Sequence, residues 1–81
     1  MDNRLESYER YTFSDTEHEF PVYKKSPAAT EGHAPAIIVM HEVPGIYPAV
    51  IDFSERLIAE GYTVYMPSLI GTPGKAYSDA Y

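Results

Sequence analysis

The chain has 81 residues and a net charge of −6, with 44% hydrophobic residues, 22% charged residues and no cysteine. This balance is typical of a globular protein, and the length allows one domain at most. The acidic charge disfavours nucleic acid and anionic membrane surfaces as partners. The lack of cysteine excludes disulfides, thiolate metal sites and a cysteine nucleophile within this sequence.

The first part of the sequence predicts a loosely attached start followed by a hairpin. Residues 1–10 are polar and acidic and lack the apolar stretch of a secretory signal, so we expect a frayed start and a soluble cytoplasmic protein. Aromatic and β-branched residues then predict strands at about 11–13 and 19–23, separated by a polar turn. Residues 24–35 hold two prolines and a glycine, which indicates a loop.

The middle of the chain predicts a strand, a helix and a second strand. A run that is apolar almost throughout, at about residues 36–41, is typical of a strand buried on both faces in a parallel sheet. Residues 48–60 carry an apolar stripe at helical spacing, which predicts an amphipathic helix about 20 Å long. Gly61 suits the helix end, and a further strand follows at about 62–66. The two strands should be parallel with a right-handed crossover.

The predicted sheet has too little helix to cover it. A parallel sheet needs cover on both faces, and one amphipathic helix covers only one. We therefore expect residues 1–81 to be the N-terminal segment of a single, incomplete α/β domain, either the front of a larger fold or the product of a truncated reading frame. The alternative is a dimer in which a second copy supplies the missing cover by self-association through the uncovered sheet face.

The segment from Val39 to Ile46 (Val-Met-His-Glu-Val-Pro-Gly-Ile) joins the apolar strand to the helix. In α/β folds, ligands bind at the carboxyl ends of the strands, so the carboxylate of Glu42 should face a pocket. Backbone N–H groups that leave the strand can point into the same space, ahead of a helix N-terminus that favours negative charge. This arrangement suits the stabilisation of an oxyanion in acyl transfer.

These residues carry a family resemblance. The run from Ala36 to Ile46, followed by the run from Phe53 to Pro67, resembles the N-terminal part of the dienelactone hydrolase family, α/β-hydrolases that open lactone and ester bonds. The similarity rests on a His-Glu-hydrophobic-x-Gly turn, a helix and a Gly-Tyr-x-Val strand, within residues 35–71. It implies a partial α/β-hydrolase fold and, for the complete enzyme, a small ester or lactone substrate. We expect no cofactor and no metal.

The resemblance also implies roles for individual residues. Glu42 matches the family glutamate that contacts the nucleophile and helps to control its reactive state. Val43 matches the residue whose backbone N–H contributes to the oxyanion hole, so that its side chain is incidental. His41 and Gly45 match positions that shape the turn.

The rest of the family's catalytic machinery is absent from this sequence. The family nucleophile, Cys or Ser, lies in a downstream G-x-C/S-x-G elbow, and its Asp and His follow later. No serine of this chain is flanked by glycines in that pattern. We therefore expect the 81-residue chain to be inactive alone.

Each candidate residue also has a purely structural explanation. Glu42 can cap the helix or bind a backbone N–H of the turn, and His41 can be a hydrogen-bonded structural histidine rather than a general base. Gly45 can serve only a positive φ angle. The spacing of His18, His33 and His41 matches no metal site. The competing function is therefore a catalytically inactive fragment or a small acidic interaction module.

Overall fold

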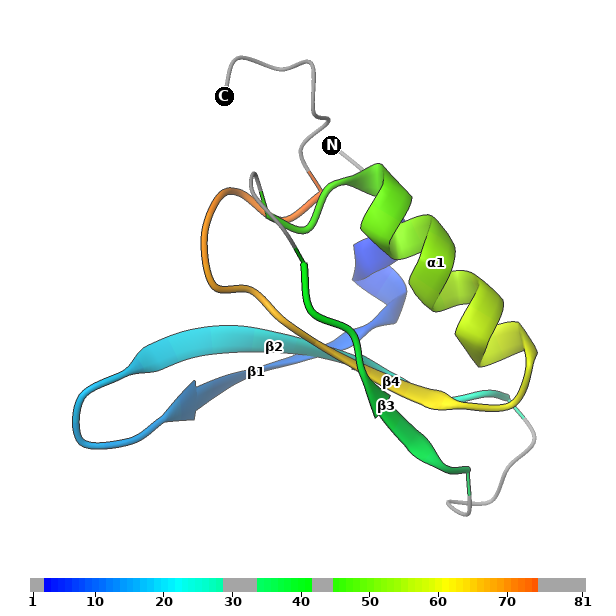
Figure 1. The fold of residues 1–81 in the computed structure, drawn as a ribbon, viewed down its shortest axis with the longest axis horizontal. Coiled ribbons are helices and arrows are strands. Elements are labelled where there is room, and N and C mark those ends of the chain that lie inside the picture. Colours follow the sequence, from blue (N-terminus) through cyan, green and yellow to red (C-terminus); the bar gives the residue numbers. More distant parts are fainter. Residues whose placement is uncertain (1–2, 29–33, 42–44, 75–81) are drawn as a thin grey trace.

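The computed structural model describes residues 3–28, 34–41 and 45–74. In this part of the chain, one mixed sheet carries one α-helix on one of its sides (Figure 1). The elements, in chain order, are the 3₁₀ helix η1 (Asn3–Ser7), the strands β1 (Glu9–Ser14), β2 (Glu19–Lys25) and β3 (Ala36–Ile38), the helix α1 (Pro48–Ala59) and the strand β4 (Thr63–Pro67).

The strands follow the order β1-β2-β4-β3 across the sheet. The predicted hairpin is present, because β1 pairs with β2 in antiparallel register from Glu9–Lys24 to Ser14–Glu19. β2 also pairs with β4 in antiparallel fashion, whereas β3 and β4 are parallel neighbours, as the sequence predicts. Both strands of the hairpin are longer than predicted and β3 is shorter. The right-handed crossover stays a prediction.

Residues 3–8 are ordered against the rest of the fold rather than frayed, so the prediction of a frayed start was wrong for them; residues 1 and 2 lie outside the described part of the chain. Residues 3–7 form η1, and the ring of Tyr8 is only 6% exposed. The Tyr8 hydroxyl donates to a carboxylate oxygen of Glu55 in α1 at 2.5 Å, and the Lys25 ammonium lies 5.2 Å from the centre of the Tyr8 ring. Tyr8 and Leu5, two core contacts within a polar run, are too few to form a periodic pattern, which is why the sequence did not indicate this packing.

The core lies between α1 and the face of the sheet that α1 covers. Ile51, Ser54 and Ile58, which recur at helical spacing, are the buried residues of α1. They meet Val64 and Met66, alternate residues of β4, and the Ser54 hydroxyl donates to the Met66 sulfur at 3.1 Å. At 12 residues, α1 is the longest helix in the described ranges, and none there combines the length and apolarity that membrane crossing requires.

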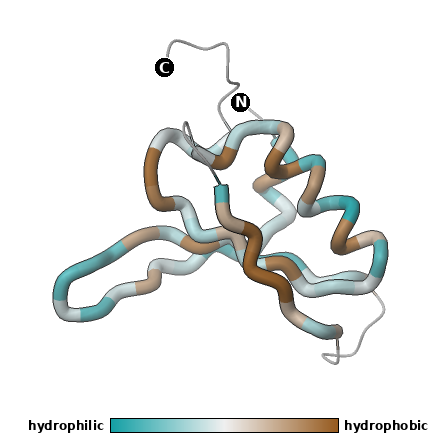
Figure 2. Tube along the Cα trace, viewed as in Figure 1, coloured by the Kyte–Doolittle hydropathy of each residue, from teal (hydrophilic) through white to brown (hydrophobic). Residues whose placement is uncertain are grey.

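The opposite face of the sheet is not covered within the described residues. Figure 2 shows the apolar run along β3, but only alternate residues of that run contact the helix side. Ile37 and Val39 pack toward α1, whereas Ile38 is 66% and Met40 59% exposed. The prediction of a strand buried on both faces is therefore wrong for the described residues: the run is apolar on both faces, but only the face toward α1 is covered.

The carboxylate of Glu55 joins three elements, and its removal should lower stability. It accepts hydrogen bonds from Tyr8 after η1 and from Lys25 of β2, whose ammonium lies 3.2 Å away. We expect Glu55→Ala to lower the free energy of unfolding by about 1–2 kcal/mol, because a largely buried hydroxyl loses its acceptor. Urea unfolding measures this. Glu60→Ala, at the exposed end of the same helix, is the matched control and should change stability by less than about 0.5 kcal/mol. Equal effects would contradict the prediction.

The turn between β1 and β2 should weaken in acid. An oxygen of Asp15 accepts from the backbone N–H groups of Glu17 at 2.8 Å and His18 at 2.7 Å, and these bonds hold the pKa of Asp15 below its usual value. A lowered pKa means that the stabilisation is complete above about pH 4 and is lost as the pH falls through the folded-state pKa. Titration of the Asp15 carboxyl by NMR checks the direction. An Asp15 that titrates at or above the pKa of the unfolded chain would contradict it.

Candidate functional site

The candidate site lies where β3 and β4 end. Because these strands are parallel, their carboxyl ends meet at one edge of the sheet, which is where ligands bind in α/β folds. The two predicted catalytic residues, Glu42 and Val43, lie outside the described residues, as does Pro44. The site is therefore built from the two flanks of that loop, His41 on one side and Gly45 on the other.

His41 is tied to the chain that follows β4. Its Nε2 atom accepts a hydrogen bond from the backbone N–H of Leu69 at 2.9 Å. A nitrogen that accepts must carry a lone pair, so this contact requires a neutral imidazole. The prediction that His41 is hydrogen-bonded is confirmed, and this bond ties the end of the β3 segment to the residues after β4.

Gly45 is held by a close approach as well as by its backbone angle. It is buried with φ of +130°, a conformation that favours glycine, as the sequence suggested. A Cβ at this position would lie 2.5 Å from the carbonyl oxygen of Ile70. Next to it, Ile46 accepts a hydrogen bond at 2.7 Å from the backbone N–H of Gly74. The second flank is thus fixed against the same stretch of chain as the first.

This stretch, Ser68–Gly74, is here called the post-β4 segment. Its first residue is hydrogen-bonded to the sheet, because the N–H of Ser68 donates to the carbonyl of Pro21 in β2 at 2.8 Å. Sequence reasoning found no pattern beyond Pro67 and missed the role of this segment. The sequence feature that could have indicated a turn-rich, ordered segment is its glycines. Gly71 and Gly74 both have positive φ angles in the structure, of +77° and +84°.

The N-terminus of α1, the helix that follows the loop, contributes a positive electrostatic potential. Tyr47 precedes the first turn of α1 and makes no side-chain capping bond, and no acidic residue occupies that turn. The first backbone N–H groups of a helix carry partial positive charge and favour an anion. Within the described ranges, no group of three His, Asp or Glu side chains is arranged to hold a metal ion.

Comparison with known proteins identifies the family. The model of the dienelactone hydrolase family matches residues 20–80, which run from β2 through the candidate site and the post-β4 segment. The chain belongs to this family. The resemblance predicted from the loop and the β4 region is thereby confirmed, and the family fold is an α/β-hydrolase fold of which the sheet and helix described here form a part.

The matched relatives are much longer than the matched region. A "Putative carboxymethylenebutenolidase" of Salmonella typhimurium is 35% identical over 51 residues, which cover 63% of this chain and 19% of that protein. The protein of the same name from Escherichia coli K12 is 35% identical over 49 residues, covering 60% of this chain and 18% of that protein. A "Putative hydrolase fragment YghX" of E. coli K12 is 33% identical over 52 residues, covering 64% and 44%. The chain thus spans about a fifth of the two carboxymethylenebutenolidases.

A methyl group at Gly45 should disrupt the site edge more than one at Gly61. Both glycines have positive φ, but a Cβ at Gly61 meets nothing within 4 Å, whereas at Gly45 it meets the Ile70 carbonyl. We expect Gly61→Ala to cost about 1–2 kcal/mol from backbone strain alone, and Gly45→Ala at least about 1 kcal/mol more. Urea unfolding of both variants measures the difference. If the two variants are equally stable, the close approach to Ile70 does not constrain the loop.

Proposed function

We propose that residues 39–46 supply the oxyanion-hole loop of a carboxylic ester or lactone hydrolase. The observation that carries this proposal is the double attachment of the loop. At the carboxyl edge of the parallel pair β3 and β4, His41 on one flank and Ile46 on the other are hydrogen-bonded to the post-β4 segment, which Gly45 approaches closely. Membership of the dienelactone hydrolase family supports the reaction class.

Fixed flanks matter because an oxyanion donor works by being in place before charge develops. A backbone N–H stabilises the tetrahedral intermediate only if it need not reorganise during the reaction. In the proposed mechanism, the N–H of Val43 donates to the oxyanion, and Glu42 contacts the attacking nucleophile. The nucleophile, a thiolate or an alkoxide, comes from a part of the family fold that this sequence does not contain.

The substrate class follows from the family and from the names of the relatives. Butenolide, in the names of the two carboxymethylenebutenolidases, is an unsaturated five-membered lactone. We propose a small lactone or ester for the complete protein. Attack on the carbonyl carbon breaks the acyl C–O bond, which opens the ring of a lactone or releases the alcohol of an ester. In this proposal, the negative charge that develops on the tetrahedral oxygen is stabilised by the backbone N–H of the loop.

The isolated chain should not turn over an activated ester. Because no nucleophile elbow is present in the sequence, we expect hydrolysis of p-nitrophenyl acetate by the 81-residue chain to equal that of its Glu42→Gln variant. Release of p-nitrophenolate, followed by absorbance, measures this. A burst or a turnover above the variant would show that the chain carries its own nucleophile.

The role of the loop is tested in a chimera. The matched region of the E. coli carboxymethylenebutenolidase is replaced with the matched residues of this chain, and lactone hydrolysis is measured. We expect Val43→Pro, which removes the N–H, to lower kcat by about 10²–10³-fold, and Val43→Ala, which keeps it, to stay near the parent chimera. An active chimera in which Val43→Pro has no effect would refute the oxyanion role.

A second candidate function is favoured by the exposed apolar surface of the sheet. Ile38 and Met40 are more than half exposed, and large exposed apolar patches mark interaction sites. The chain as given would then act as a small acidic interaction module without catalysis. The sequence encoded downstream of residue 81 discriminates the two functions: an elbow motif and a later histidine favour the enzyme.

A further inference from the structure

The 3₁₀ helix η1 and the residue after it bind one flank of α1. Pro48, Asp52 and Glu55 recur at intervals of four and three residues, which places them in one stripe along the helix. Arg4 of η1 contacts the first two residues of this stripe, and Tyr8 contacts the third. Figure 1 shows η1 beside α1. The start of the chain is thereby joined to a helix that lies 44 to 48 residues further along.

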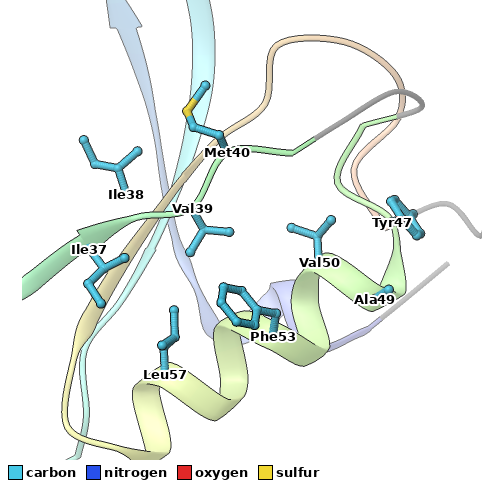
Figure 3. A pocket seen from close by; sticks show the side chains of 9 residues that line it. All are labelled: Ile37, Ile38, Val39, Met40, Tyr47, Ala49, Val50, Phe53 and Leu57. Atoms are coloured by element: carbon cyan, nitrogen blue, oxygen red, sulfur yellow. The ribbon is translucent and has the colours of Figure 1, made fainter.

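This flank is separate from the flank of α1 that faces β3. Figure 3 shows Val50, Phe53 and Leu57 on the side of the pocket beside β3. At about 3.6 residues per turn, these three residues lie on the opposite side of the helix from Pro48 and Asp52. The contacts of η1 with α1 therefore do not depend on what covers β3.

Arg4 makes the contacts that lie nearest to the candidate loop. Its guanidinium donates to the backbone carbonyl of Pro48 at 3.3 Å and forms an ion pair with the carboxylate of Asp52. Pro48 is the first residue of α1, and Tyr47 is its N-cap. The Pro48 carbonyl is thus three residues from Gly45, where the second flank of the loop begins. Arg4 holds the helical turn that this flank enters.

These contacts fix a position more than they add stability. The side chains of Arg4 and Asp52 are 38% and 64% exposed, and exposed ion pairs contribute little to the free energy of unfolding. A guanidinium is a rigid planar fork, however, and Arg4 uses it to join a side-chain acceptor to a backbone acceptor. Contacts of this kind add geometric specificity. Arg4 is therefore suited to set where the first turn of α1 lies.

The role of Arg4 cannot be taken from the family pattern. The family model matches residues 20–80, so η1 lies outside the matched region. The evidence for this role is the geometry of this chain alone: two contacts of one guanidinium with the helical turn next to the loop.

We infer that Arg4 is a positioning residue for the oxyanion-hole loop. By holding Pro48 and Asp52, it sets residues 45–47 relative to the post-β4 segment. The catalytic consequence rests on the proposed function, whereas the position of the flank can be measured without any reaction. Because an oxyanion donor must be placed accurately before charge develops, a shift of the first turn of α1 is expected to impair the loop.

The first test is amide hydrogen exchange in the 81-residue chain, followed by NMR. The N–H of Gly74 donates to the carbonyl of Ile46, so its exchange reports how firmly this flank is fixed to the post-β4 segment. We expect Arg4→Ala to speed exchange at Gly74 about 3- to 10-fold, with little change in β4. Tyr8→Phe, which removes the bond to Glu55 further along α1, is the matched control. It should affect β4, through overall stability, rather than Gly74.

The second test measures lactone hydrolysis in a chimera. Residues 1–74 of this chain replace the start of the E. coli carboxymethylenebutenolidase up to the end of its matched region. We expect Arg4→Ala to lower kcat about 3- to 10-fold and to leave KM unchanged, because the loop acts on the transition state rather than on bound substrate. Tyr8→Phe should leave both constants near those of the parent chimera. Val43→Pro is measured alongside, to test the loop itself.

The outcomes separate this inference from the proposed function. Exchange at Gly74 that is unchanged in Arg4→Ala, or is equally fast in Arg4→Ala and Tyr8→Phe, overturns the inference. An unchanged kcat in Arg4→Ala, in a chimera that Val43→Pro impairs, overturns the catalytic part and leaves the proposed function intact. If Val43→Pro has no effect, the proposed function fails, and exchange at Gly74 alone decides whether Arg4 positions the flank.

Discussion

The structure depends on the placement of β4 between β2 and β3. β4 is hydrogen-bonded on both sides, antiparallel to β2 and parallel to β3, and its Val64 and Met66 are fully buried beneath α1. Within the described residues, the strand–helix–strand unit joins the hairpin in the sheet through the pairing of β4 with β2. The packing of the helix, the approach of the two strand ends and the attachment of the post-β4 segment all follow from this central position.

The sequence predicted the helix and the parallel strands but not the packing of the N-terminal residues. The helix was predicted within one residue of its end, because its apolar spacing and the following Gly61 are local signals. The parallel pair followed from the apolar run at 36–40 and the strand before Pro67. The packing of Tyr8 could not be predicted in this way, because its hydroxyl is hydrogen-bonded to Glu55, which is 47 residues away in the chain. No local pattern reports a contact of that separation.

The candidate site shows the same division. The hydrogen bond of His41 and the positive φ of Gly45 agreed with sequence reasoning, but their common partner, the post-β4 segment, was not found. That segment is linked to the flanks of the loop through backbone atoms of Leu69, Ile70 and Gly74, so the side chains of Leu69 and Ile70 give no sign of these contacts. The roles of Glu42 and Val43, and the limits of the domain, remain predictions from the family pattern.

The strand order also sets when the sheet can form during synthesis on the ribosome. β1, β2, β3 and α1 leave the exit tunnel before β4, yet β2 and β3 do not pair with each other. Until residues 63–67 emerge, the hairpin and β3 remain separate, and the apolar face of α1 has no Val64 or Met66 to pack against. The nascent chain therefore holds the apolar β3 without a pairing strand until β4 emerges, a state in which chaperones bind and aggregation begins.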